Sequence, residues 1–270
     1  MEMLPFYILA GAGVGFMVGL TGVGGGSLMT PLLLMFGIPP HVAIGTDLLY
    51  ASATKVNAVY SHHRHKTIRW KIALTLLAGS LPASLATTLA LRLLFPDADS
   101  YKHILTNTLG IMLILTSVVL LLKRLLINDP DSLTPGAAGG FLHRHKRGMT
   151  FFTGILLGVF VTLSSVGAGA FGTAALMILY HRLPILNIIG SELAHAVPLT
   201  LVAGLGHFLV LGNVDLWLLG ALLIGSMPAT HLGAKLSTKI SDKVLYPILT
   251  TVLLLLGIKY SLPLFQQLLG

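Results

Sequence analysis

The chain has 270 residues, of which 54% are hydrophobic and only 10% charged, and its mean hydropathy is +0.87. Such a composition cannot cover a water-soluble surface, so it excludes a soluble globular protein and predicts an all-α polytopic membrane protein. The formal net charge is +8, and the basic residues lie in loops between apolar segments. This placement indicates contact with the lipid bilayer and no nucleic-acid partner.

Apolar stretches close to the roughly 20 residues that one membrane crossing requires recur along the whole chain. The clearest are residues 72–94, 104–126, 186–211 and 214–236. Residues 1–5 lack the basic region of a cleavable signal peptide, so we expect the first apolar segment to remain in the mature protein.

A glycine-rich break interrupts the apolar sequence twice, at residues 21–27 (TGVGGGS) and 164–170 (SSVGAGA). Two further pairs of similar blocks follow in the same order, 44–47 with 189–192 and 79–83 with 225–229. This order predicts a duplicated protein. We expect a first transmembrane repeat at 1–127, a basic cytoplasmic linker at 128–148 and a second transmembrane repeat at 149–270.

Basic residues predict which loops face the cytoplasm. Lys and Arg gather at 61–71, in the linker and at 235–243, whereas 96–102 and 212–215 carry few of them. If the basic loops are cytoplasmic, the segment 149–180 starts and ends on that side and forms a re-entrant hairpin that turns at its glycine break. The segment 5–36 does the same from outside. Each half then has about three further crossings and the two repeats are inverted; a single broken crossing in each half, giving parallel repeats, also fits the lengths.

The two breaks predict an anion site. Non-helical backbone at membrane depth is tolerated only where it is buried in protein or lines a cavity. Each break therefore predicts a short helix, the first one ending near residue 36, whose free N–H groups and positive dipole end face a shared cavity near the midplane. Glycine lets a substrate approach the backbone, and hydroxyl groups add donors, although close helix packing is another explanation for the small residues. The predicted substrate-binding residues are Thr21, Gly24, Gly25, Gly26, Ser27, Ser164, Ser165, Gly167 and Gly169.

Asp47 and Glu192 are acidic residues inside apolar segments, at equivalent positions of the two repeats. A carboxyl group in the membrane is costly, so both predict proton or cation coupling, unless each simply caps the neighbouring hairpin. His195 follows Glu192 by three residues and could join the same path. Lys55 shares the helix face of Asp47. We expect its ammonium group to pair with Asp47, to attract anions or to extend to the cytoplasmic surface. Further candidate cavity-lining residues are Asn57 and Asn187.

Neither a metal nor a cofactor is expected. The chain has no Cys, which excludes Cys-ligated metals and thiolate catalysis. The histidine clusters at 62–65 and 143–145 are interleaved with basic residues, which favours a cytoplasmic basic surface over a metal site.

The blocks at 22–26, 30–33, 39–46, 211–215 and 225–228 together resemble the TauE/SafE family of sulfite and organosulfonate permeases. The resemblance covers nearly the whole chain in the same order. It implies a carrier in the cytoplasmic (inner) membrane of a bacterium or archaeon that exports sulfite, an organosulfonate or a related oxyanion, linked to protons. Two features depart from the family pattern: the second break has Ala168 and Ala170 where glycine is more usual, and Asp47 replaces a small hydroxyl residue.

Two other functions also fit parts of this sequence. A passive anion channel or uniporter differs from a carrier because it does not accumulate its substrate and does not depend on Asp47 or Glu192. An intramembrane hydrolase would use Ser164 or Ser165 with a histidine base, His195 or His207. The first repeat lacks equivalents of these groups, so we expect no enzymatic activity. Stripes of Gly and Ala also allow a homodimer.

Overall fold

The structure is a computed structural model that describes residues 4–21, 28–128, 145–236 and 242–269. All regular structure in these parts of the chain is α-helical, so the predicted all-α class is confirmed. The helices are α1 (Leu4–Thr21), α2 (Met29–Met35), α3 (Pro40–Arg64), α4 (Trp70–Leu94), α5 (Ala98–Asn128), α7 (Lys146–Ser164), α8 (Ala170–Leu179), α9 (Ile185–Leu209), α10 (Leu216–Leu236) and α11 (Asp242–Leu269).

Five of the described helices are long and apolar enough to cross a membrane: α4, α5 over Ala98–Leu122, α7, α9 and α10. The four apolar stretches expected from the sequence fall on α4, α5, α9 and α10, so these predictions are confirmed. Prolines inside α4, α9 and α10 do not end these helices. Neighbouring helices in a membrane protein can satisfy the backbone groups that such a proline leaves free.

The second glycine-rich break separates α7 from α8. Ser165 ends α7 in the left-handed conformation with φ of 59°, and Gly167 and Gly169 have φ of 114° and 136°. Residues other than glycine rarely adopt such angles, which explains why the sequence is rich in glycine here. The first break, with Gly24, Gly25, Gly26 and Ser27, lies outside the described residues; α1 ends before it at Thr21 and α2 follows it as the expected short helix.

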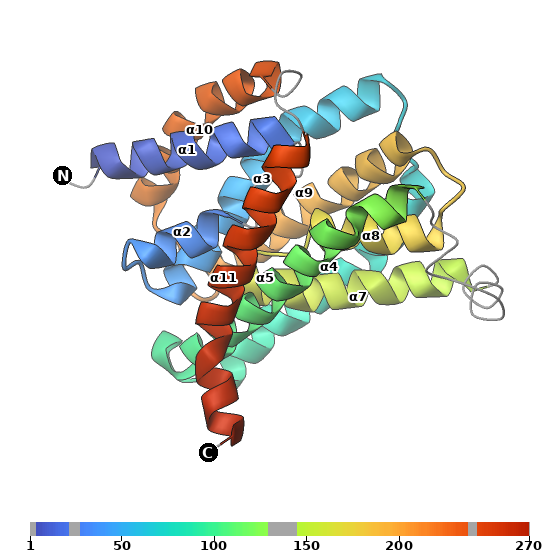
Figure 1. Cartoon of the computed structure of the whole chain (residues 1–270). Helices are drawn as coiled ribbons and strands as arrows, with labels where there is room; N and C mark the ends of the chain where they lie inside the picture. The colour runs from blue at the N-terminus through green and yellow to red at the C-terminus, as the bar shows by residue number, and fades with distance from the viewer. Residues whose placement is uncertain (1–3, 22–27, 129–144, 237–241, 270) are drawn as a thin grey trace.

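Two pairs of helices cross at very short range. α1 lies along α10 and α4 lies along α7 (Figure 1). A Cβ atom added at Gly15 would meet the backbone of Ser226, and one added at Gly158 would meet the backbone of Ser80. Helices approach this closely through small residues, so part of the glycine content of the chain serves packing.

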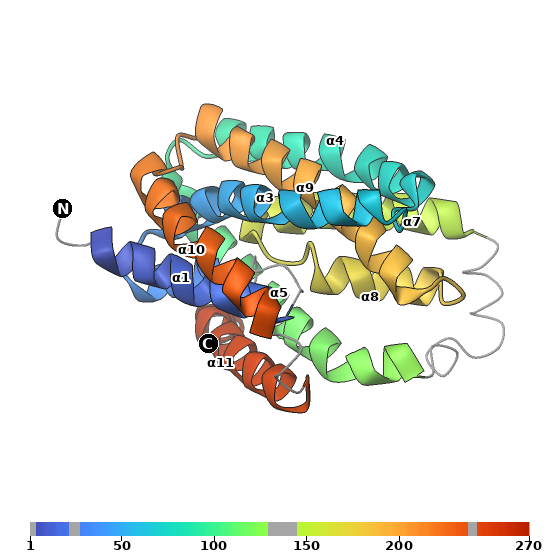
Figure 2. The ribbon, with the colours of Figure 1, turned by 90° about the horizontal axis from the view of Figure 1, so that it is seen from above.

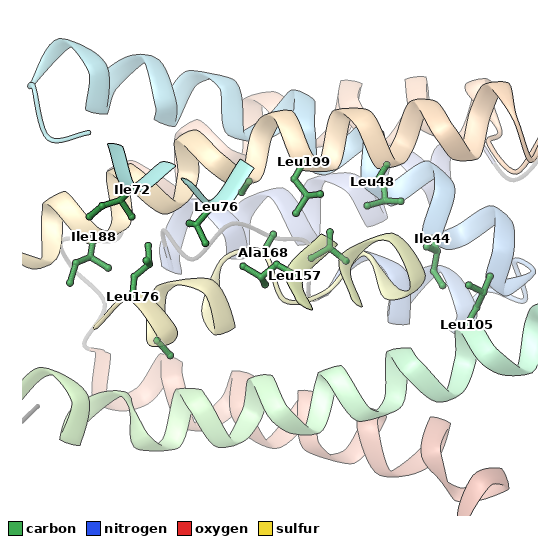
Figure 3. Close-up of a cluster of buried hydrophobic side chains, with 14 of the residues drawn as sticks. Ile44, Leu48, Ile72, Leu76, Leu105, Leu157, Ala168, Leu176, Ile188 and Leu199 are labelled. Carbon is green, nitrogen blue, oxygen red and sulfur yellow. The ribbon is translucent and has the colours of Figure 1, made fainter. Parts of the chain in front are cut away.

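The pair α3 and α9 occupies the middle of the bundle between these crossings (Figure 2). Apolar side chains of α3, α4, α5, α7, α8 and α9 form one buried cluster around it, including Leu48, Leu157 and Leu199 (Figure 3). α3 itself carries several polar side chains that are almost fully buried. This apolar packing therefore brings polar groups of α3 and α9 together in the interior.

Candidate functional site

The site is a group of buried ionisable side chains on α3 and α9. The exposed fraction is 0% for Asp47, 3% for Lys55, 1% for Glu192 and 0% for His195. Charged side chains are rarely buried unless they are paired or bound to a ligand. The sequence predicted a role for each of these residues, and the structure brings them to one place, beside the second break.

Asp47 is held by the first turn of α2. Its Oδ2 atom accepts hydrogen bonds from the Thr30 hydroxyl at 2.6 Å and from the Thr30 backbone amide at 3.2 Å. Its Oδ1 atom has no hydrogen-bond partner. Asp47 therefore caps the neighbouring short helix, as one of the two sequence interpretations proposed, and still leaves one carboxyl oxygen unpaired.

Lys55 lies near both carboxyl groups and is bonded to the second break. Its Nζ atom donates a hydrogen bond to the carbonyl oxygen of Ala168 at 3.2 Å, inside the second break. The ammonium group also interacts electrostatically with both Asp47 and Glu192. Because Lys55 is buried, it does not extend to the cytoplasmic surface, and that alternative is wrong.

Glu192 faces the beginning of α8. Its carboxyl group interacts with the backbone amide of Gly169, the residue that precedes the helix. A Cβ atom added at Gly172, in the first turn of α8, would lie 3.1 Å from both Cγ and Oε1 of Glu192. Oε1 has no hydrogen-bond partner. The second carboxyl group thus lies against a helix N-terminus, where negative charge is stabilised.

The two serines of the second break differ in their surroundings. The Ser164 hydroxyl donates to the carbonyl of Phe160 at 2.6 Å and accepts from the amide of Val166 at 3.2 Å, so it stabilises the end of α7. The Ser165 hydroxyl is 3% exposed and has no hydrogen-bond partner, although the side chain lies close enough to Asp47 to interact with it. Of the two predicted hydroxyl donors, Ser165 is the one available to a ligand.

Each histidine on α9 has one ring nitrogen bonded to a neighbouring helix. The Nε2 atom of His195 forms a hydrogen bond with the Ser80 hydroxyl at 3.0 Å, and the Nε2 atom of His207 bonds the Thr162 carbonyl at 3.0 Å. The second ring nitrogen of each has no partner. Neither ring is bonded to Ser164 or Ser165, so the structure does not form the serine–histidine pairs that the hydrolase alternative named.

The two candidate asparagines do not belong to this group. Asn57 is exposed on α3, away from the buried cluster. Asn187 is buried, and its side-chain amide donates to the carbonyl of Thr67 at 2.9 Å, which fixes the α3–α4 loop against the start of α9. In the described part of the chain, no group of three His, Asp or Glu side chains is arranged to hold a metal ion.

The sequence analysis missed Thr30 and Ser80 as site residues. Each supplies the hydroxyl group that holds an ionisable side chain of α3 or α9. The signal was present, because Ser80 lies inside a repeated block and Thr30 inside one of the blocks that resemble the TauE/SafE family. Their partners are 17 and 115 residues away, however, and that pairing is set only by the folded chain.

Residues 7–260 match the sequence profile of the family described as "Sulfite exporter TauE/SafE". The chain belongs to the TauE/SafE sulfite exporter family. The match covers almost the entire chain, so the resemblance noted in the sequence is confirmed, and the family together with five long apolar helices identifies a multi-pass membrane transporter.

Curated relatives are described as probable membrane transporters. The chain is 37% identical over 254 residues to "Probable membrane transporter protein YjnA" of Bacillus subtilis, covering 93% of this chain and 97% of the relative. It is 29% identical to "Probable membrane transporter protein YdhB" of the same organism, covering 86% and 89%. It is 28% identical to "Probable membrane transporter protein MJ0441" of Methanocaldococcus jannaschii, covering 95% and 94%. No solved structure matches the chain.

Proposed function

We propose that this protein is a secondary transporter for proton-coupled export of a small sulfur-containing oxyanion, sulfite or an organosulfonate. The observation that carries the proposal is the buried Lys55 ammonium group, which interacts with two buried carboxyl groups and is bonded to the second break. A cation in this position attracts an anion into the membrane interior, and carboxyl groups beside it can exchange protons. Family membership supports the substrate class.

The proposal includes two inverted repeats, 1–127 and 149–270, joined by a cytoplasmic linker at 128–148. Equivalent contacts support it: the amide of Asp215 donates to the Thr46 hydroxyl at 3.2 Å, and the amide of Arg69 donates to the Ser191 hydroxyl at 2.8 Å. Likewise, α1 packs on α10 as α7 packs on α4. The first residues of α1 and α7 lie at opposite ends of the molecule (Figure 2), as an inverted arrangement requires.

The substrate would bind near the membrane midplane, between the two breaks. On the second side, the groups suited to an oxyanion are the Ser165 hydroxyl, the Lys55 ammonium group and the N-terminus of α8 with Gly167 and Gly169 before it. On the first side, Thr21, Gly24, Gly25, Gly26 and Ser27 would contribute in the same way. Backbone N–H groups at a helix start stabilise a bound anion through non-covalent contacts.

Proton coupling would run through Asp47, Glu192 and His195. Two carboxylates and one ammonium group carry a net charge of −1 when all are ionised, and burying a net charge in the membrane is costly. Uptake of an anion makes this charge more negative, and a proton on one carboxyl group compensates for it. Movement of the substrate and movement of the proton would therefore be coupled.

The test is sulfite flux in proteoliposomes, with and without an imposed pH gradient. The wild-type protein should accumulate sulfite when the gradient is present, and Asp47→Asn should abolish the gradient-driven part. The matched control is Asp99→Asn, because Asp99 is an exposed carboxylate paired with Lys102 at the surface. This control should transport like the wild type.

The result also distinguishes a carrier from a channel. Sulfite flux that ignores the gradient and survives Asp47→Asn would refute proton coupling and identify a channel or uniporter. Absence of both sulfite and organosulfonate flux in the wild type would refute the substrate class.

Lys55→Gln provides a second test of the same site. Removing the buried ammonium group leaves two carboxyl groups without their cation and removes the attraction for an anion, so we expect at least a tenfold loss of flux at equal protein level, about 1.4 kcal/mol. Lys71→Gln, at an exposed position of α4, serves as the control and should leave flux unchanged.

A further inference from the structure

The N-terminus of α8 already has an anionic partner within the chain. α8 has ten residues, and the Glu192 carboxyl group from α9 lies against its start, interacting with the Gly169 amide and touching the position of a Gly172 Cβ atom. A helix start with free N–H groups stabilises negative charge from a side chain and from a bound oxyanion in the same way. A carboxylate and a sulfite or sulfonate group therefore compete for one place.

Two buried polar atoms near the second break have no hydrogen-bond partner. Glu192 Oε1 and Ser165 Oγ both belong to almost fully buried residues and both lack a hydrogen-bond partner. A buried polar atom without a partner costs free energy, and such atoms in native proteins usually have a functional explanation. Of the two, Glu192 Oε1 is the atom at the start of α8, whereas the Ser165 side chain interacts with Asp47.

The charged groups around Glu192 limit which ligand can replace its carboxylate. Lys55 of α3 interacts electrostatically with the carboxyl groups of both Glu192 and Asp47. On α9 itself, the His195 ring is bonded to Ser80 and also interacts with Lys55. The end of α7 and the first turn of α8 bring only apolar, hydroxyl and backbone groups. Replacing the carboxylate by another anion at the α8 start keeps the partner of Lys55 negative.

We propose that the Glu192 carboxylate is an internal competitor of the transported oxyanion. In the state seen here, Glu192 occupies the oxyanion position at the start of α8. When one proton from the aqueous side binds to a Glu192 carboxyl oxygen, the neutral side chain loses its attraction to the helix start, and the oxyanion takes its place. One proton and one negative charge enter together, so the charge of the cluster is unchanged. This inference rests on the proposed function and assigns its coupling step to Glu192.

The variant that tests the exchange is Glu192→Gln, which keeps the shape of the side chain and removes its negative charge. Sulfite binding to the purified protein is measured by calorimetry at a lower and a higher pH, because fewer Glu192 carboxyl groups carry a proton at the higher pH. We expect the wild type to bind sulfite more weakly at the higher pH. Glu192→Gln should bind about tenfold more tightly than the wild type at the higher pH and should lose most of this pH dependence.

Proton uptake gives an independent readout. In weakly buffered solution, the wild type should take up one more proton per bound sulfite than Glu192→Gln, because any proton that sulfite itself carries is common to both proteins. In proteoliposomes, Glu192→Gln should still exchange internal for external sulfite but should no longer accumulate it in response to a pH gradient. Asp99→Asn, with its exposed carboxylate, should behave like the wild type in each assay.

Weaker sulfite binding by Glu192→Gln at both pH values would overturn the competition, because Glu192 would then act as a ligand or a structural group. Equal proton uptake by the two proteins would overturn it as well, and this comparison still holds if the variant binds poorly. Failure of the wild type to bind either sulfite or methanesulfonate would contradict the proposed function itself, which keeps the two failures distinguishable.

Discussion

The close crossing of α4 and α7 leads to a prediction about Gly158. A Cβ atom at this position would lie 2.9 Å from Cα of Ser80 and 2.9 Å from Cβ of Ala83, and closer still to the Ser80 carbonyl oxygen. Ordinary carbon contacts begin near 3.4 Å, so in Gly158→Ala the two helices must separate by about 0.5 Å or more. Overpacking of this size costs about 1–3 kcal/mol.

The matched control lies on the same helix. Gly148 is an exposed residue of α7, and a Cβ atom added there would meet nothing within 4 Å. Gly148→Ala should therefore stabilise the protein slightly, by up to about 1 kcal/mol, because alanine has the higher helix propensity. The same change from Gly to Ala is therefore expected to destabilise the protein at position 158 and to stabilise it at position 148.

Thermal unfolding of the purified protein in detergent, followed by the loss of monodisperse material, measures both effects. Gly158→Ala should unfold at a lower temperature than the wild type, and Gly148→Ala at the same or a higher one. If Gly158→Ala were as stable as Gly148→Ala, the reasoning would be refuted, since the α4–α7 crossing could not be as close as described. Flux should fall with Gly158→Ala as well, because Ser80 at the crossing holds the ring of His195.

Three more predictions concern polar groups. Ser165→Ala should raise the KM for sulfite severalfold without lowering thermal stability, whereas Ser164→Ala should lower stability because its hydroxyl is bonded at the end of α7; equal effects in flux and unfolding assays would contradict this separation. Thr30→Val should remove one of two hydrogen bonds to Asp47 and reduce gradient-driven flux, which Thr30→Ser should restore; unchanged flux in Thr30→Val would argue against a role for this bond. In the α4–α5 loop, hydrogen bonds from the hydroxyl and amide of Ser100 lower the pKa of Asp97. The stabilisation from this contact should therefore be present at neutral pH and disappear as the pH falls below the ordinary carboxyl range. Thermal unfolding of Ser100→Ala at several pH values checks this, and a difference from wild type that persists in acid would contradict it.

Much of the fold could be predicted because the sequence pattern of a membrane-spanning helix is local. A crossing needs about 20 apolar residues in a row, and the composition of 72–94 or 186–211 meets that requirement without reference to the rest of the chain. The short helices α2 and α8 were also expected, because non-helical backbone in a membrane needs a reason and glycine marks where it occurs. The first break itself lies outside the described residues, so its binding role stays a prediction.

Long-range partners were harder to predict. Sequence reasoning gave Lys55 three possible positions, and burial beside Ala168 excluded one of them. It treated Ser164 and Ser165 alike, although a backbone turn in the left-handed conformation points them to different surroundings. It gave Asn57 and Asn187 the same role, whereas one is exposed and the other fixes a loop.

The sequence by itself determined that this is a helical, multi-pass membrane protein of the TauE/SafE family, with repeated blocks and two buried acidic residues in equivalent positions. These properties follow from hydropathy, spacing and order, which need no knowledge of distant contacts. Only the tertiary structure decided that Asp47, Lys55 and Glu192 meet, and that each carboxyl group lies against the start of a short helix. The physical reason is that a buried charge is stabilised by whichever dipoles and counter-charges the packing of α2, α3, α8 and α9 brings within reach, and the chain order does not specify that packing.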